Sequence, residues 1–158
     1  MSFWQSLLKF LQLDLMSRAR RVARRLNFYS IDVTEPFPVY EFAETYGLSL
    51  PEELSCDDYE MRWFTACRIG AKALGIKTLE NSPQRIAFAD VNMESETQLQ
   101  IDYALEVFAE ELLMPYDMLE LANYEIANDL KVRHNHHHFG VPQRKFFSSL
   151  RRVLHKKR

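Results

Sequence analysis

Glycine, cysteine and long apolar runs are all scarce in this chain of 158 residues. Its two cysteines, Cys56 and Cys67, are too few for a disulfide framework and have no metal-ligand spacing. We therefore expect a reducing compartment, the cytoplasm. No apolar run approaches the ~18 residues that a membrane-spanning helix needs. Lys9 and Asp14 interrupt the apolar start of the chain, so we expect no secretory signal.

The chain also lacks internal repeats and any linker rich in glycine or serine. With 47% hydrophobic and 13% aromatic residues, it can bury a core of its own. We therefore predict a single domain. Amphipathic and arginine-rich helices occupy residues 1–30, and the main domain, with a basic C-terminal helix, occupies residues 31–158.

Acidic residues are absent from the C-terminal part of the chain. Residues 130–158 contain 9 Lys and Arg and no acid, whereas residues 32–129 contain 21 acids and 5 Lys and Arg. Since arginines also crowd the N-terminal part, the order is basic, acidic, basic. The basic parts could bind nucleic acid or an acidic partner, or fold back onto the acidic middle. The cations concerned are Arg18, Arg20, Arg21, Arg24, Arg25, Arg144, Lys145, Arg151 and Arg152.

Helical spacing of apolar residues dominates the pattern. It predicts a mainly α fold with a small or reduced β-sheet, of the α+β class. The strand candidates are 48–50 and 85–91. The side chains expected to face the core near the C-terminus are Leu119, Ala122, Ile126 and Leu130, and then Phe146, Phe147, Leu150, Val153 and Leu154. The expected helices are 2–16, 17–28, 38–46, 61–75, 101–114, 116–132 and 143–154.

The most specific local string is FAEELLMP, residues 108–115. Before and within it, apolar residues recur at i, i+3, i+4 and i+7, the spacing of one buried helix face. Pro115 has no amide hydrogen and disfavours helix at the residue before it, so this helix should end near Met114. The pattern alone indicates an amphipathic helix without any particular chemistry.

Four segments in order resemble the ImmA/IrrE family of zinc metallopeptidases, which act on repressors and other regulators in bacteria, phages and mobile elements. FAEELLMP resembles the end of the family's third-ligand helix. The resemblance covers roughly residues 36–154 and implies a zincin-like helical scaffold. The four segments are PVYEFAETYGL, RWFTACRIGAKAL, YALEVFAEELLMP and HHHFGVPQRKFFSSLRRVL.

The positions at which that family holds its zinc are altered. HExxH places two imidazoles at i, i+4 on one helix face, with a glutamate between them as base. Alignment on Phe64–Thr65 puts Arg68 and Lys72 at the histidines and Ile69 at the glutamate. A guanidinium cannot ligate zinc, and isoleucine cannot act as a base. The third-ligand glutamate aligns with Ala104, between Asp102 and Glu106. We therefore predict no metal, no cofactor and no catalytic residue.

The altered site has a second interpretation. Arg68 and Lys72 at i, i+4 place two cations where the metal charge would lie. Asp102 and Glu106, also at i, i+4, could face them. A salt-bridge cluster could then replace the zinc and link the two helices. The alternative is that both pairs are solvated and point away from each other.

Histidines 134, 136, 137 and 138 form the other polar cluster. His134 and His138 at i, i+4 could pair on a helix, but no third ligand is evident, so we predict no metal there. A gain of charge near pH 6.5 is the expected consequence. Cys67 should lie inside its helix face as a small apolar residue.

Three functions are compatible with this pattern. The first is a pseudo-peptidase, a non-catalytic ImmA/IrrE-like protein that regulates by binding a protein partner. That partner would be a repressor, another regulator, or a phage or mobile-element component. The second is a nucleic-acid-binding transcriptional regulator that uses the basic termini. The third is a residual metallopeptidase with a rebuilt site.

Overall fold

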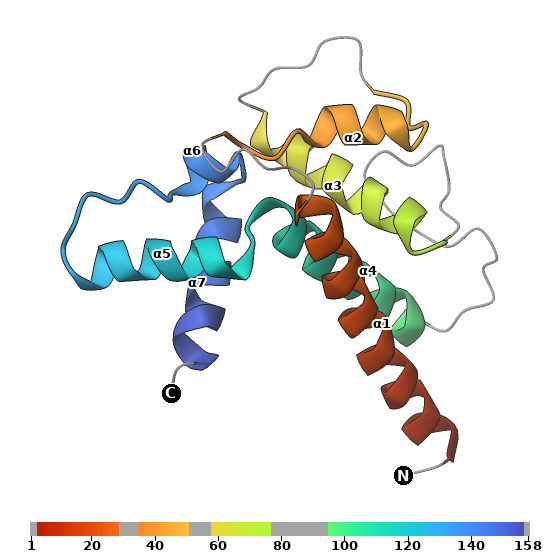
Figure 1. The fold of residues 1–158 in the computed structure, drawn as a ribbon. Helices are drawn as coiled ribbons and strands as arrows, with labels where there is room; N and C mark the ends of the chain where they lie inside the picture. The colour runs from red at the N-terminus through yellow and green to blue at the C-terminus, as the bar shows by residue number, and fades with distance from the viewer. Residues whose placement is uncertain (1–2, 29–34, 51–57, 77–94, 157–158) are drawn as a thin grey trace.

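The computed structural model describes residues 3–28, 35–50, 58–76 and 95–156. These ranges contain helices and no strand, so the predicted mainly α fold is confirmed and the strand expected at 48–50 is absent. The strand predicted at 85–91 lies outside the described residues. The helices (Figure 1) are α1 (Phe3–Phe28), α2 (Val39–Thr45), α3 (Tyr59–Ala73), α4 (Ser95–Leu113), α5 (Tyr116–Ala127), α6 (His136–Phe139) and α7 (Gln143–Lys156).

Helix α1 is one continuous helix, and the prediction of two helices meeting at Ser17 was wrong. Its 26 residues include no proline or glycine, so nothing in the backbone stops the first helix before Ser17. The C-terminal half of α1 packs along α4, where Ala19 and Ala23 are fully buried (Figure 1). The Asn27 side chain donates to the Leu112 carbonyl at 2.7 Å, which ties the end of α1 to α4.

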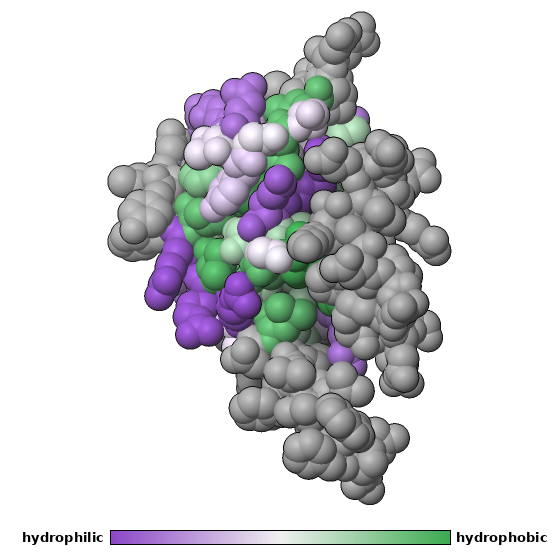
Figure 2. All heavy atoms as spheres, turned by 90° about the vertical axis from the view of Figure 1, so that its right-hand side faces the viewer, coloured by the Kyte–Doolittle hydropathy of each residue, from purple (hydrophilic) through white to green (hydrophobic). Residues whose placement is uncertain are grey.

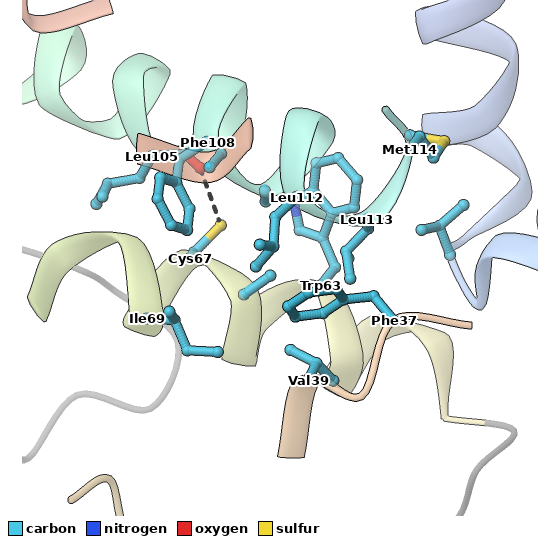
Figure 3. Close-up of a cluster of buried hydrophobic side chains, with 14 of the residues drawn as sticks. Phe37, Val39, Trp63, Cys67, Ile69, Leu105, Phe108, Leu112, Leu113 and Met114 are labelled. Atoms are coloured by element: carbon cyan, nitrogen blue, oxygen red, sulfur yellow. Dashed lines mark hydrogen bonds between the residues drawn. The ribbon is translucent and has the colours of Figure 1, made fainter. Parts of the chain in front are cut away.

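The core lies between α3 and α4 (Figure 3). Asp58 caps α3 by accepting a hydrogen bond from the Met61 amide at 3.0 Å. Gly70 faces the Phe108 ring so closely that an added Cβ would lie 2.6 Å from a ring carbon. As predicted, α4 ends just before Pro115, and the face containing Phe108 is buried.

Helix α2 packs on α3 and ends at Thr45, and Gly47 just after it has the predicted left-handed conformation, with φ +71°. Arg62 on α3 joins two other parts of the chain, although it is almost fully buried. Its Nε donates to the Gly140 carbonyl at 3.0 Å, and its Nη2 donates to the Phe37 carbonyl at 2.7 Å. One guanidinium therefore holds the segments before α2 and after α6 against α3.

Helices α5 and α7 cross and pack on each other (Figure 1). Leu119, Ala122 and, from α7, Phe146, Leu150 and Val153 are buried as predicted. Four other predicted core residues are wrong, since Ile126, Leu130, Phe147 and Leu154 are 46%, 52%, 46% and 47% exposed. Helix α5 ends at Ala127, five residues earlier than expected, so Leu130 lies beyond it. Phe147 and Leu154 lie on the flank of α7, outside its buried face.

Within the described ranges, no helix is both long enough and apolar enough to cross a membrane. Figure 2 shows the side opposite α5 and α7, where hydrophobic and hydrophilic residues are mixed over the coloured part of the surface.

Candidate functional site

The α3 residues at which the resemblance predicts an altered zinc site point in different directions. Ile69, predicted to replace a glutamate base, is 0% exposed and belongs to the core (Figure 3). Arg68 is directed away from α4, because its Nη1 donates to the Ser49 carbonyl at 2.9 Å. Its guanidinium carbon also lies 5.9 Å from the Phe64 ring centroid. Lys72 is exposed to solvent.

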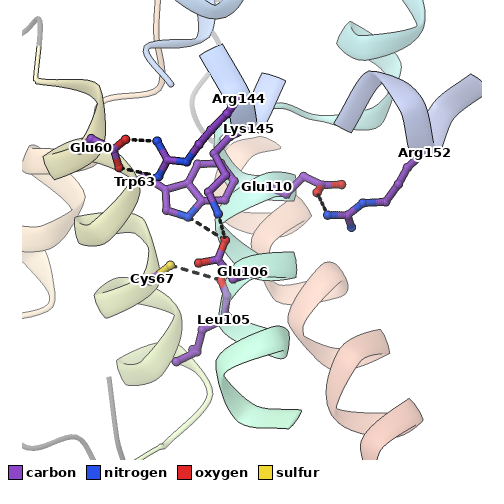
Figure 4. A network of polar contacts seen from close by, with 9 residues as sticks. All are labelled: Glu60, Trp63, Cys67, Leu105, Glu106, Glu110, Arg144, Lys145 and Arg152. Carbon is purple, nitrogen blue, oxygen red and sulfur yellow. Dashed lines mark hydrogen bonds and ion pairs between the residues drawn. The ribbon is translucent and has the colours of Figure 1, made fainter. Parts of the chain in front are cut away.

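The corresponding positions on α4 also separate. Ala104, predicted from the resemblance to replace a third ligand, is fully buried, while Asp102 is exposed. The Glu106 carboxylate accepts two hydrogen bonds at the same oxygen. One comes from Trp63 Nε1 at 3.0 Å and the other from Lys145 Nζ at 2.7 Å (Figure 4). Lys145 Nζ also lies 4.9 Å from the Trp63 ring centroid, within range of a cation–π interaction.

The ion pair that Glu106 forms therefore differs from the salt-bridge cluster predicted between α3 and α4. In the part of the chain that the structure describes, neither Arg68 nor Lys72 forms an ion pair with Glu106, whose cation is Lys145 of α7. Local spacing could not reveal this partner, because 39 residues separate Glu106 from Lys145. The signal that was available is the absence of acids from residues 130–158, because any carboxylate that pairs with a cation of α7 must then come from another part of the chain.

Ion pairs of this kind attach both basic segments to the acidic middle. Helix α7 pairs through Arg144 with Glu60, through Lys145 with Glu106 and through Arg152 with Glu110 (Figure 4). The Arg152–Glu110 distance is 2.7 Å. On α1, Arg24 pairs with Glu111 at 3.3 Å, and Arg18 Nη2 donates to the Leu74 carbonyl at 2.9 Å. The expected folding back of the basic ends is thus found for these five cations.

Two of these carboxyl groups have opposite pKa shifts. The hydrogen bond from Arg144 lowers the pKa of the exposed Glu60 carboxyl. Burial raises the pKa of Glu110, and the positive charge of Arg152 only partly opposes that effect. The protonated form of Glu110 is thus more favoured than that of a free glutamate, although Arg152 pairs with its carboxylate.

Cys67 lies beneath the Glu106 cluster in a buried position. Its thiol is buried and donates to the Leu105 carbonyl at 3.6 Å (Figure 4). Burial raises the pKa of this thiol well above its ordinary value, which disfavours the reactive thiolate. The prediction that Cys67 is a buried small apolar residue is confirmed.

The histidine segment is organised by Glu125 at the end of α5. Its carboxylate accepts the Arg133 amide at 2.9 Å and the His134 amide at 3.1 Å, and it lies 2.6 Å from His134 Nδ1. Burial alone would raise the pKa of Glu125, but these hydrogen bonds outweigh it and lower the pKa. Burial, followed by repulsion from His134, lowers the pKa of His138. The rings of His134 and His138 lie edge to face with centroids 5.1 Å apart, but His134 precedes α6, so the two do not share a helix as predicted.

A metal centre has no obvious donor set in this arrangement. Among the described residues, no group of three or more His, Cys, Asp and Glu side chains is placed to hold a metal ion. Comparison of the chain with protein families, with characterised proteins and with solved structures found no match.

Proposed function

We propose that the chain is a non-catalytic relative of the ImmA/IrrE peptidases, built on their zincin-like scaffold, which regulates by binding a protein partner. The partner would be a repressor, another regulator, or a phage or mobile-element component. The burial of Ile69 supports this proposal most directly. A base at this position would have to reach a metal-bound water, but the side chain there is 0% exposed and packs in the core.

The surroundings of Ile69 also favour a structural role for α3. Gly70 and Cys67, on either side of it, contact Phe108 and Leu105 of α4. Arg68 and Lys72, at the two ligand positions, offer no neutral imidazole to a metal. The helix that carries HExxH in the resembled family would here be a packing element.

Metal analysis tests the absence of catalysis. The full chain, purified without chelator and then incubated with a small excess of Zn²⁺ and dialysed, should retain much less than one zinc per chain. Lys72→Ala should retain the same amount as the wild type. About one tightly held zinc per chain, reduced in the Lys72→Ala variant, would support a residual metallopeptidase with a rebuilt site.

Partner capture tests the binding role. The tagged chain should retain a regulator from an extract of its native host, and nuclease treatment should leave that complex intact. Loss of the captured protein after nuclease would instead favour the nucleic-acid alternative.

The nucleic-acid alternative has its own support in four cations for which no ion pair is found within the described residues. These are Arg20, Arg21 and Arg25 on α1 and Arg151 on α7. Contacts from four cations to phosphates would give a slope of log affinity against log salt of about −4. The double variant Arg21→Glu, Arg25→Glu should then weaken binding to duplex DNA. Arg144→Gln serves as the control and should change the binding little, because Arg144 already pairs with Glu60.

A further inference from the structure

Exposed large apolar side chains concentrate on one part of the molecule. Of the eight such residues within the described ranges, six lie on α5, on α7 or in the turn after α5. Single exposed apolar residues are normal, whereas a concentration of them marks an interaction surface. The six residues are Leu121, Tyr124, Ile126, Leu130, Phe147 and Leu154.

Helix α7 contributes a strip formed by Phe147, Arg151 and Leu154, which we call the α7 strip. The spacing i, i+4, i+7 places the three residues on one helix face. All three are exposed. In the part of the chain that the structure describes, Arg151 forms no ion pair, unlike Arg144, Lys145 and Arg152 on the same helix. The strip is therefore apolar with one positive charge that is not neutralised within the chain.

Helix α5 contributes a second strip with the opposite charge. Asp117, Leu121 and Tyr124 follow the same i, i+4, i+7 spacing, and all three are exposed. We call this set the α5 strip. It lies on the side of α5 away from the buried Leu119 and Ala122.

We propose that this protein self-associates by docking the α7 strip of one copy on the α5 strip of a second copy. Charge selects this crossed pairing, because Arg151 then approaches Asp117 of the other copy. Pairing of two α7 strips would bring Arg151 toward its own equivalent, and pairing of two α5 strips would do the same with Asp117. Helices α5 and α7 pack on each other in each chain, so the two strips lie on neighbouring helices. A twofold axis would repeat the contact with the two copies exchanged.

The size of the surface indicates a weak dimer. Helices α5 and α7 have 12 and 14 residues, which corresponds to lengths of about 18 and 21 Å. Two such helices on each copy provide an interface near the lower end of the specific range, about 1,200 Å² in total. We therefore expect association that depends on concentration, with a Kd of roughly 10–100 µM. This inference is independent of the function proposed above.

Sedimentation velocity on the full chain from about 1 to 300 µM tests the proposal, and the wild type should change from monomer to dimer over this range. Arg151→Glu and Asp117→Arg should each raise the dimer Kd at least about 10-fold, because each places like charges at the contact. The double variant with both changes should regain dimerisation close to that of the wild type. An equimolar mixture of the two single variants should form a heterodimer, because one contact then pairs the two reversed charges and the other pairs wild-type Arg151 with wild-type Asp117.

Matched controls are Arg21→Glu on α1 and Glu44→Arg on α2, which make equal charge changes at exposed residues outside both strips and should leave the dimer Kd unchanged. If either strip variant misfolds by circular dichroism, Tyr124→Ser and Phe147→Ser remove apolar contacts instead and should also weaken dimerisation. A wild type that stays monomeric at 300 µM would overturn the proposal. So would a double variant that is no better than the single ones.

Discussion

At the scale of single residues, the contact between Arg62 and Gly140 depends most on atomic detail. Gly140 has φ +66°, and a Cβ there would lie 2.5 Å from Arg62 Nε. Gly75 has a similar φ of +72°, but a Cβ added there would meet nothing within 4 Å. A substitution at Gly75 therefore tests backbone strain alone, whereas the same substitution at Gly140 tests backbone strain together with the close approach of the Arg62 guanidinium.

We expect Gly75→Ala to lower the free energy of unfolding by about 1–2 kcal/mol, the penalty for an L-residue in the left-handed region. Gly140→Ala should cost about 2–4 kcal/mol, because Arg62 must also move from the Gly140 and Phe37 carbonyls. Urea unfolding of the two variants measures the difference. Equal losses would show that Arg62 moves without penalty.

Glu125 gives a prediction about pH. Its pKa is lowered in the folded chain, so the stability it contributes is present above about pH 4.5, its unfolded pKa. That contribution is lost as the pH falls through the folded pKa. Glu125→Gln should therefore be less stable than the wild type at pH 7, by about 1–3 kcal/mol.

The deficit of Glu125→Gln should shrink as the pH is lowered below 4.5. Chemical denaturation at several pH values would reveal the narrowing, with the exposed Glu44→Gln as control. A deficit that is constant with pH would mean that the carboxylate charge is irrelevant. His138 should also make the folded chain less stable on acidification, but over a higher pH range. Its pKa is lowered by folding, so this loss of stability begins as the pH falls below about 6.5, its unfolded pKa.

At the scale of elements, α7 offers adjacent ion pairs that differ in burial. Arg144 and Glu60 are both more than half exposed, whereas Lys145 is 26% exposed and lies between Glu106 and the Trp63 ring. Exposed pairs contribute little because solvent screens them and side-chain entropy opposes them.

Arg144→Met should therefore change the free energy of unfolding by less than about 0.5 kcal/mol. Lys145→Met should lower it by about 1 kcal/mol, because the ion pair and the cation–π contact are both lost. It should also alter the fluorescence of Trp63, which Arg144→Met should not. Identical thermal unfolding and emission in the two variants would contradict this ranking.

The elements also show what sequence could predict. Helical spacing and proline located α2, α3 and the end of α4 to within about two residues, because burial of one face decides both spacing and structure. Helix α4 begins at Ser95, six residues before the predicted start. Ser17 misled the assignment of α1, since a good N-cap residue is also tolerated inside a helix. Phe147 and Leu154 were assigned to the core because composition cannot say how wide the buried face of α7 is.

At the scale of the whole molecule, α7 is part of the core rather than a basic tail. It buries Phe146, Leu150 and Val153, each of which contributes about 1.5–3 kcal/mol. The sum, roughly 5–9 kcal/mol, is comparable with the total stability of a domain of this size.

A chain truncated after Pro142 should therefore fail to fold. Circular dichroism and protease sensitivity would measure the loss of helix, with a chain truncated after Lys156 as control. A truncated chain with the same unfolding midpoint as the wild type would show that α7 is an appendage.

The same scale explains why the candidate site could be predicted only in part. Whether Arg68, Ile69 and Lys72 can ligate zinc depends on residue identity, so this part is read directly from the sequence. The partner of Glu106 depends on how α7 returns to α3 and α4, which no local pattern encodes. The charge asymmetry predicted that the ends could fold back, but not which carboxylate meets which cation.

The thiol of Cys67 can report on the motion of this packing. Because it is enclosed between α3 and α4 and its pKa is raised, a thiol reagent can modify it only after these helices separate. In a Cys56→Ser background, the rate of alkylation divided by the rate for a free thiol gives the equilibrium constant for that separation. Alkylation of this one side chain, followed by mass spectrometry under native conditions, would thus measure how often α3 and α4 separate.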